Sequence, residues 1–235
     1  MSPPIKSKCI TCDICNMRVK GMMIFVAVML CASMLHAQEI KIDKDLRNLV
    51  NAVMSLRQPD SSKKVSAINS VKSHLSRNMK WRLMDELRDE NNGECFLSKK
   101  MTHFGLNPIL NGVLIDRKGR DNVPGHMLNS KSSKYDYSLI EKGVKAKKTV
   151  KYTLKGRIGK QDFVIIPYTQ STDNLSVRIY KGADNLKYSI QKDKGGCLYM
   201  HVDTNLKRTD CIMFEIENKS NTNVAVVIIN HNMRK

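Results

Sequence analysis

The stretch TVKYTLKGR, residues 149–157, places the apolar side chains of Val150, Tyr152 and Leu154 at alternate positions, with polar residues between them. Successive side chains of a β-strand point to opposite faces, so this alternation is typical of a strand with one buried side and one solvent-facing side. The period of two begins near residue 135 and recurs towards the C-terminus. The C-terminal part of the chain is therefore predicted to be a β structure.

Six more strand-like stretches follow, separated by short segments rich in Asn, Asp, Gly and Lys that are typical of turns. Short strands at this spacing favour an antiparallel β-sandwich, jelly-roll-like, over residues 135–235. No helix-length segment interrupts them, so we expect no parallel crossover connection. The six stretches are QDFVIIPY, LSVRIYKG, LKYSIQ, CLYMHVD, CIMFEIE and NVAVVIIN.

Part of this region resembles the pre-peptidase C-terminal domains, which are β-sandwiches attached to exported bacterial enzymes. The resemblance covers about 85 of the 235 residues. It consists of a G-x-x-D-F pattern before an apolar strand and an L-x-V-x-I pattern in the next strand. The matching residues are Gly159, Asp162, Phe163, Leu175, Val177 and Ile179. The resemblance implies a noncatalytic accessory or binding module of a secreted bacterial protein.

The N-terminal part has the period of a helix. In residues 43–56, DKDLRNLVNAVMSL, apolar side chains recur every three or four positions after an aspartate that can cap the first turn. Residues 59–75 and 80–93 repeat the pattern, and the second stretch ends at an Asn-Asn-Gly stop. We expect two or three helices within residues 38–91, with the single Trp81 in their core.

Residues 92–134 contain many turn formers and two prolines, Pro108 and Pro124. We interpret them as a connector, in which GVLID, residues 112–116, forms at most a short strand. The predicted fold class is therefore α+β, with an N-terminal helical region followed by a C-terminal sandwich.

The leader MRVKGMMIFVAVMLCASMLHAQE, residues 17–39, has a basic head, an apolar run and a small residue, Ala37, just before Gln38. The apolar run has about 14 residues, whereas a helix that crosses a bilayer needs about 20. This anatomy predicts a secretory signal peptide, residues 17–37, cleaved between Ala37 and Gln38. An uncleaved anchor and a buried helix are the alternatives.

Residues 1–16 precede this leader and contain Cys9, Cys12 and Cys15. Thiolates at such spacing can bind zinc, but a fourth ligand is missing from the segment. We interpret the segment as a gene-model extension or an extended signal head, and a metal knuckle is the third alternative.

Removal of the leader would leave an odd number of cysteines, so at least one thiol would stay unpaired in a monomer. A simple hairpin of the strands that begin at Cys197 and Cys211 sets the two thiols out of register, which disfavours a disulfide between them. We expect Cys95, Cys197 and Cys211 to act mostly as buried small apolar residues.

The chain has 40 Lys and Arg against 22 Asp and Glu, a formal net charge of +18. Residues 131–160 alone contain 10 basic and 2 acidic residues. Such an excess favours an acidic polysaccharide or protein partner. The alternative is that lysines on an edge strand only prevent sheet-to-sheet aggregation. The candidate binding residues are Lys145, Lys147, Lys148, Lys151 and Lys155.

No hydrolase, zinc-protease, P-loop or dinucleotide motif is present in the sequence. The histidines are scattered, and Cys95 lacks the signature of a catalytic thiol, so no catalytic residue is assigned. The turn aspartates Asp173, Asp184 and Asp193 could bind a calcium ion, although turn aspartates usually serve the turn itself. No other cofactor or metal is expected.

These observations predict an exported protein, located in the periplasm, on the cell surface or in the medium. We expect a noncatalytic binding or accessory role. Nucleic-acid binding is disfavoured because of the predicted export and because no aromatic platform for base stacking is evident. The alternative is an extracytoplasmic hydrolase whose catalytic residues carry no recognisable motif.

Overall fold

The computed structural model describes residues that belong to one compact unit, Ile40–Lys235. The predicted signal peptide, residues 17–37 with its cleavage site at Ala37 and Gln38, and residues 1–16 lie outside the described residues. The described residues are 40, 42–58, 60–76, 81–84, 87–121, 136–155, 157–169, 173–182 and 184–233.

The helices are α2 (Lys44–Ser55), α3 (Ser61–Ser76) and α4 (Leu106–Asp121). The first begins where the sequence predicts, because Oδ1 of Asp43 accepts hydrogen bonds from the backbone N–H groups of Asp45 and Leu46 at 3.0 and 3.1 Å. A side-chain oxygen at this position satisfies N–H groups that have no partner within the helix. The apolar face of α2 is buried, as its period predicts.

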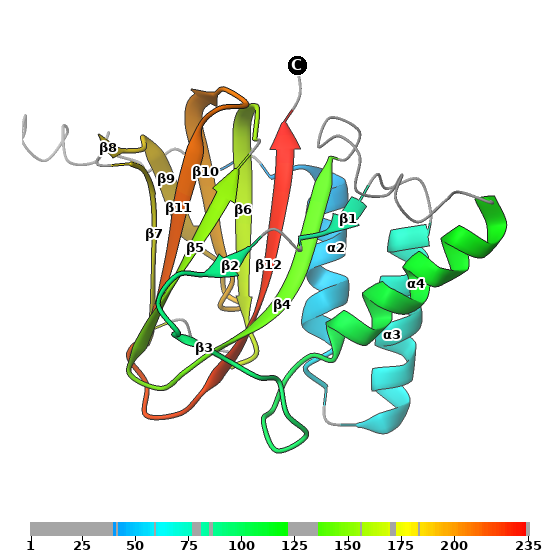
Figure 1. Cartoon of the computed structure of the whole chain (residues 1–235). Coiled ribbons are helices and arrows are strands. Elements are labelled where there is room, and N and C mark those ends of the chain that lie inside the picture. Colours follow the sequence, from blue (N-terminus) through cyan, green and yellow to red (C-terminus); the bar gives the residue numbers. More distant parts are fainter. Residues whose placement is uncertain are drawn as a thin grey trace, which may run out of the picture. The chain divides into compact units, whose positions relative to one another are not determined.

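The described strands form two sheets (Figure 1). The helix-covered sheet has the order β1-β4-β12-β6-β10-β9, and β3 also pairs with β4. Its strands are β1 (Trp81–Leu83), β3 (Glu94–Cys95), β4 (Tyr137–Val144), β6 (Gly159–Pro167), β9 (Tyr188–Lys192), β10 (Leu198–Leu206) and β12 (Val224–Met233). The outer sheet has the order β2-β5-β11-β7-β8. Its strands are β2 (Arg88–Asp89), β5 (Lys148–Lys155), β7 (Leu175–Lys181), β8 (Asp184–Asn185) and β11 (Cys211–Asn218).

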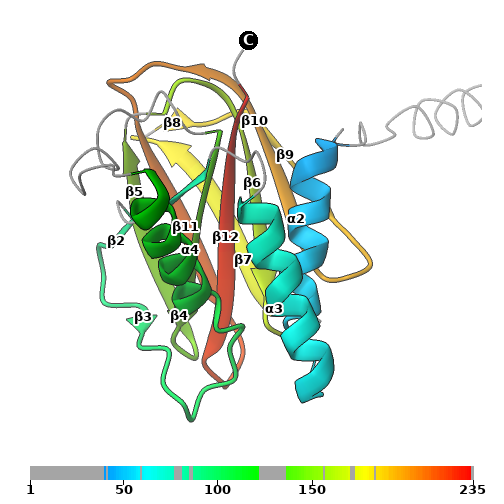
Figure 2. The same cartoon turned by 90° about the vertical axis from the view of Figure 1, so that its right-hand side faces the viewer.

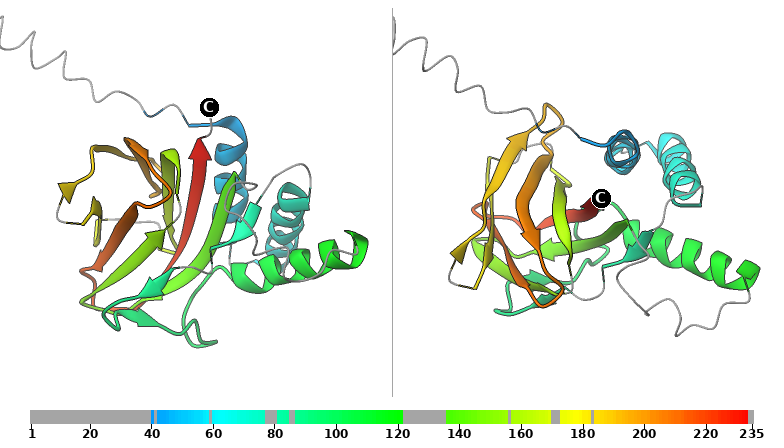
Figure 3. Two further views of the ribbon diagram at one scale, coloured as in Figure 1. Left: turned by 45° about the horizontal axis from the view of Figure 1, so that its top comes forward. Right: turned by 90° about the horizontal axis from the view of Figure 1, so that it is seen from above.

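Three layers result, with the helices on one face of the helix-covered sheet and the outer sheet on its other face (Figures 2 and 3). Two apolar cores separate the layers, one between helices and sheet and one between the two sheets. On β12, Val227 and Ile229 face the helix-side core, whereas Val226 and Ile228 face the core between the sheets. Burial on both faces explains why this strand is continuously apolar.

The outer sheet has only one buried face, which is why its strands alternate in the sequence. Val150, Tyr152 and Leu154 of β5 enter the core between the sheets, as the opening stretch predicts. Lys151 and Thr153 point to the opposite, outward face. The predicted β structure is therefore confirmed for this strand, including the side that is buried.

Every described pair formed among the strands numbered β4 to β12 is antiparallel. Strand β1, in contrast, runs parallel to β4, with Trp81 opposite Tyr137. The expectation of no parallel crossover, made for residues 135–235, is therefore met by the described pairs of that region. The parallel pair comes from β1, which precedes that region. The crossover from β1 to β4 contains α4, which is the usual way to join parallel strands.

The third predicted helix, over residues 80–91, is wrong, because β1 and β2 occupy this stretch. Trp81 is buried as expected, and its Nε1 donates to the carbonyl oxygen of Leu75 at 2.7 Å. Both strands are very short. Two or three residues are too few to show the alternation of a strand, so the sequence pattern favours a helix. Pairing with β4 and β5 decides the local structure instead.

The connector prediction for residues 92–134 misses α4, and the suggested strand at residues 112–116 is wrong. Leu106, Ile109, Leu110 and Val113 are buried, at helical spacing. The proline at position 108 is the third residue of the helix, where a missing N–H removes no intrahelical hydrogen bond. None of the helices in the described ranges combines the length and apolar character of a membrane span.

Candidate functional site

The five lysines predicted as a binding site extend from the turn after β4 to the end of β5 (Figure 1). Backbone oxygens fix two of them. Nζ of Lys145 donates to the carbonyl oxygen of Asn92 at 2.9 Å, and Nζ of Lys147 donates to that of Lys219 at 2.6 Å. A carbonyl oxygen positions an ammonium group but does not neutralise its charge. The turn between β4 and β5 therefore keeps its positive charges.

Acidic side chains lie opposite the cations on the outward face of the outer sheet. Glu215 of β11 is opposite Lys151 on one side and Arg178 on the other. Its carboxylate lies 3.8 Å from Nζ of Lys151 and accepts a hydrogen bond from Arg178 at 2.9 Å. One carboxylate is thus shared by two cations. This face carries mixed charge, and no continuous positive stripe runs along β5.

The side chains of Lys148 and Lys155 are exposed and make no hydrogen bond or ion pair with the described part of the chain. They lie at opposite ends of β5. The five predicted residues therefore do not form one patch. Three of them gather at the β4–β5 turn, and the other two lie further along β5.

An exposed aromatic side chain, which has no signal in the sequence, lies in the loop after β3. Phe96 directly follows β3 and is 97% exposed. Strand β3 is antiparallel to the end of β4, with Glu94 opposite Val144 and Cys95 opposite Gly143, so Phe96 leaves the sheet at the end of β3 that is further from the β4–β5 turn. Lys99 and Lys100 follow in the same loop and are also exposed. Burial raises the pKa of the adjacent Cys95 thiol, and the positive charge of Lys145 opposes that rise, so this ammonium group lies close to the loop.

Internal contacts hold the loop that follows β3. The N–H of Ser98 donates to the carbonyl oxygen of Phe96 at 3.0 Å, and that of Met101 donates to Ser98 at 2.9 Å. Sγ of Cys95 contacts Sδ of Met101 at 3.8 Å. Phe96 is therefore presented on a turn with its own hydrogen bonds.

Glu141 of β4 anchors the far end of this loop and the start of α4. Its carboxylate is 1% exposed and accepts the N–H groups of Phe104 and Leu106 at 2.6 and 2.7 Å. Its backbone exchanges two further hydrogen bonds with the side-chain amide of Asn107. A buried carboxylate at a helix N-terminus satisfies N–H groups and complements the helix dipole.

Strand pairing gathers a second set of polar side chains on the helix side of the helix-covered sheet. His201 of β10, Asp162 of β6 and His231 of β12 occupy one register position. Nδ1 of His201 lies 2.7 Å from one oxygen of Asp162, and Nδ1 of His231 lies 3.4 Å from the other. One carboxylate thus lies against Nδ1 of two imidazole rings, and Nε2 of His201 lies 3.9 Å from Oδ1 of Asp203. We call His201, Asp162 and His231 the His–Asp–His row.

The row continues to β4 and to the start of α2. The ring of Tyr137 stacks on that of His231, with centroids 4.6 Å apart and planes 10° apart. The hydroxyl of Tyr137 donates to Oδ1 of Asp43 at 3.0 Å. Burial and this hydrogen bond raise the pKa of Tyr137, so the phenol stays a neutral donor. For Asp43, burial raises the pKa, but hydrogen bonds from the helix and from Tyr137 outweigh it and lower the pKa overall.

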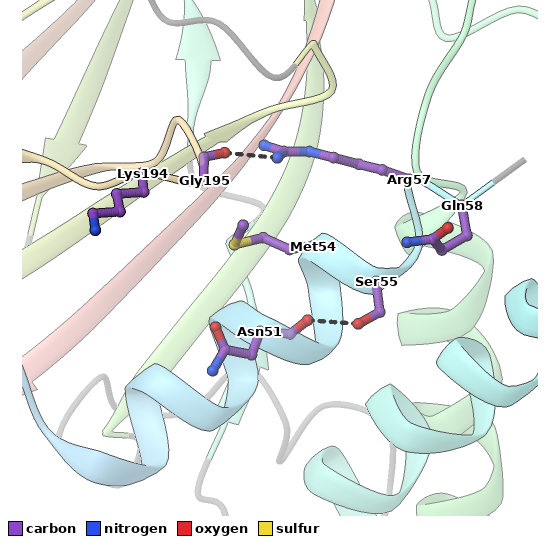
Figure 4. A pocket seen from close by; sticks show the side chains of 7 residues that line it. All are labelled: Asn51, Met54, Ser55, Arg57, Gln58, Lys194 and Gly195. Carbon is purple, nitrogen blue, oxygen red and sulfur yellow. Dashed lines mark hydrogen bonds between the residues drawn. The ribbon is translucent and has the colours of Figure 1, made fainter.

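A recess of about 530 Å³ lies between the end of α2 and the turn between β9 and β10 (Figure 4). Arg57 joins its two walls, because it donates to the carbonyl oxygen of Gly195 at 2.8 Å and also to that of Pro167. Burial lowers the pKa of this guanidinium. The recess is lined by Asn51, Met54, Ser55, Arg57, Gln58, Lys194 and Gly195. The main visible role of Arg57 is to hold the helix to the sheet.

The three cysteines in the described ranges are free thiols. Cys197 is fully buried, and its Sγ contacts Sδ of Met54 at 3.3 Å. Burial raises the pKa of Cys197 to about 12. Cys95 and Cys211 are half-buried, so the expectation of buried small residues is met fully only at Cys197. A thiol with a raised pKa is a poor nucleophile at neutral pH, which argues against catalysis by Cys95.

The turn aspartates considered for calcium have protein partners where their side chains are described. Asp173 pairs with Lys192, and Oδ1 of Asp193 accepts the N–H of Cys197 at 2.7 Å. The side chain of Asp184 lies outside the described set. Among the described residues, no group of three or more His, Cys, Asp or Glu is arranged to hold a metal ion. Calcium binding stays a prediction.

Comparison with known proteins returned no match among family models, curated proteins or solved structures.

Proposed function

We propose that the chain is an exported, noncatalytic binding module that engages an anionic partner through the lysines around β5. The observation that carries this proposal is the state of Lys145 and Lys147. Their ammonium groups are held in place by backbone oxygens and have no carboxylate within ion-pair distance in the described ranges. Fixed, unneutralised cations lose less conformational freedom when they bind an anion than mobile ones do.

We also infer that the two facing sheets form a jelly roll. Strands β4-β12-β6-β10 face strands β5-β11-β7-β8, and the chain changes sheet at most of the connections between them. Eight strands in two such sheets are typical of that fold. The resemblance to pre-peptidase C-terminal domains points to the same accessory class and stays a prediction. Fold alone does not fix function, so the cation geometry carries the argument.

The test uses retention on immobilised heparin, which is itself an acidic polysaccharide. Replacing the five candidate lysines by glutamine should abolish retention, and replacing them by arginine should preserve it. Retention of the wild-type chain should fall steeply as salt is raised, because exposed charges are screened within about 10 Å at 0.1 M. The five are Lys145, Lys147, Lys148, Lys151 and Lys155.

The control removes three cations from segments at the opposite end of the sheets, by changing Lys187, Lys207 and Arg208 to glutamine, and is compared with the triple change of Lys145, Lys147 and Lys148. All three are exposed. Equal loss of retention in the control would reduce the effect to net charge and reject the site. Circular dichroism of each variant separates lost binding from lost folding.

One observation favours a second candidate, an extracytoplasmic hydrolase. The His–Asp–His row has the imidazole–carboxylate geometry that general acid–base catalysis uses. No pocket-lining residue of the recess in Figure 4 belongs to this row. A screen of ester, glycoside and phosphate substrates with the wild-type chain and a His201→Ala variant tests it. Turnover that disappears in the variant would replace the binding proposal.

A further inference from the structure

The end of the molecule that carries the β4–β5 turn presents several lysines and one exposed aromatic side chain, Phe96. The loop after β3, the β4–β5 turn and the β11–β12 turn lie at this end in two perpendicular views (Figures 1 and 2). The hydrogen bond from Lys147 to Lys219 joins the two turns directly. We call the following residues the lysine-rich end: Lys99, Lys100, Lys145, Lys147 and Lys148.

The acidic side chains nearest to the lysine-rich end have other partners. Glu94 pairs with Lys142 at 2.9 Å, and Glu217 lies 3.6 Å from Lys219. Burial raises the pKa of Asp89, but hydrogen bonds from the backbone N–H groups that follow it and the charge of Lys145 lower it overall, so this carboxylate offsets part of the charge of Lys145. Within the described part of the chain, none of the five ammonium groups at the lysine-rich end pairs with a carboxylate. A net positive charge therefore remains there.

Phe96 gives this end an apolar component. Its side chain is 97% exposed, the highest value among the large exposed apolar residues of the described ranges. Contact with water is unfavourable for an aromatic ring, and nothing in the loop covers it. The loop is fixed at β3 and, through Glu141, at α4. The ring is thus held outward.

We propose that the lysine-rich end and Phe96 together dock the protein on an anionic lipid surface. Anionic headgroups attract the five ammonium groups, and Phe96 enters the boundary between headgroups and acyl chains. An acidic polysaccharide would satisfy the lysines but offers no apolar layer for Phe96, which is why a lipid surface fits better. This inference rests on the proposed binding of an anionic partner and names that partner.

The test places a fluorescent reporter at the tip, with Phe96→Trp in the protein as the producing cell makes it. Vesicles consist of phosphatidylcholine alone or with about a third phosphatidylglycerol. A local reporter is needed because residues 22–35, if retained, are apolar enough to bind lipid themselves. The emission of the indole at position 96, taken as the difference from the wild-type chain with its buried Trp81, should shift to the blue with anionic vesicles and stay unchanged with neutral ones. About 1 M salt should remove the shift.

Matched variants separate the charge from the ring. Changing Lys99, Lys100 and Lys148 to glutamine should weaken vesicle binding about a hundredfold, since each lysine near an anionic surface contributes about fivefold. These side chains are exposed and make no hydrogen bond or ion pair with the described residues that the change would break. The opposite-end control with Lys187, Lys207 and Arg208 changed should bind like the wild type.

For the ring, Phe96→Ala should weaken binding about tenfold or more. Ile115→Ala is the control, because Ile115 is also a large exposed apolar residue but lies on α4. An unchanged emission with anionic vesicles, together with intact heparin retention, would overturn the lipid proposal and leave the proposed function standing. Loss of both signals would reject both. An equal shift on neutral and anionic vesicles would reject the role of the lysines.

Discussion

Nδ1 of His201 lies 2.7 Å from Oδ1 of Asp162, and the two residues are direct partners in the β10–β6 pairing. The other oxygen of the same carboxylate faces Nδ1 of His231 at 3.4 Å. An ionised carboxylate only accepts hydrogen bonds, so this geometry predicts a proton on Nδ1 of each ring. One nearly buried side chain therefore fixes the tautomer of two histidines on different strands.

An Asp162→Asn variant tests this relationship. The amide offers one oxygen and one NH₂ group, so one imidazole must change its tautomer or lose its partner. We expect a loss of about 1–3 kcal/mol in the free energy of unfolding, measured by urea denaturation. Long-range ¹H–¹⁵N NMR spectra should show Nδ1–H on both rings of the wild type and a change at one ring in the variant. Wild-type rings protonated at Nε2 would contradict the assignment.

The period of the sequence predicts the parts of the fold that depend on local alternation. The strand that contains Val150 and Tyr152 has one solvent-facing side, so apolar and polar residues alternate in its sequence and the strand can be predicted. Helix α2 also buries only one face, so its apolar residues recur at helical spacing. The short strands β1 and β2 contain too few residues to show a period. Their structure depends on pairing with β4 and β5, which lie far along the chain.

The candidate sites depend even more on register. His201, Asp162 and His231 are separated by 30 to 69 positions, and only the β10-β6-β12 order brings them together. The exposure of Phe96 has no sequence signal, since an isolated phenylalanine between a strand and a loop usually points inward. The lysines were visible as composition. The sequence does not show that Lys151 lies opposite Glu215, on a face of mixed charge, whereas the lysines of the β4–β5 turn have no such acidic partner among the described residues.

Glu141 should be among the side chains whose loss destabilises the fold most. A Glu141→Ala variant leaves the N–H groups of Phe104 and Leu106 without their acceptor in a buried site. We expect a loss of about 3 kcal/mol in unfolding free energy, measured by urea denaturation. Glu217→Ala on the exposed face is the control and should change the value by less than about 0.5 kcal/mol. Similar values for both variants would contradict the anchoring role.

Two glycines should respond to alanine in opposite directions. A Cβ added at Gly143 would lie 2.6 Å from Sγ and 2.7 Å from the carbonyl oxygen of Cys95, so β3 must move away from β4. We expect Gly143→Ala to lower the melting temperature, with a cost of about 1–3 kcal/mol. Gly112 in α4 has no atom within 4 Å of such a Cβ, and alanine there should stabilise the helix by about 1 kcal/mol. Thermal denaturation of both variants checks the pair, and a stabilised Gly143→Ala would show that β3 does not pack as described.

Cys197 should make the stability of the protein fall with rising pH above about 9. Burial raises its pKa in the folded state from 9.0 to about 12. Between these values the unfolded chain has already lost the thiol proton while the folded chain retains it, so the unfolded state is favoured as pH rises. The contribution is fully present below pH 9.0 and is lost on the way to about 12. Urea denaturation at pH 8, 9 and 10 measures it, with an expected slope of about 1 kcal/mol per pH unit near the upper end.

The control for this pH dependence is Cys197→Ala, and the difference in slope between the two chains gives the contribution of the thiol. Burial also raises the pKa of several tyrosines, whose unfolded forms lose protons near pH 10, so they add the same slope to both chains. Alkylation gives an independent readout, because a thiol reacts as thiolate and must be reached by the reagent. Iodoacetamide at neutral pH should modify the half-buried Cys211 first and Cys197 only when the whole chain unfolds. Modification of Cys197 at the same rate as Cys211 in the folded protein would show that the contact between α2 and the β9–β10 turn opens readily, and that Cys197 does not control the alkaline limit of stability.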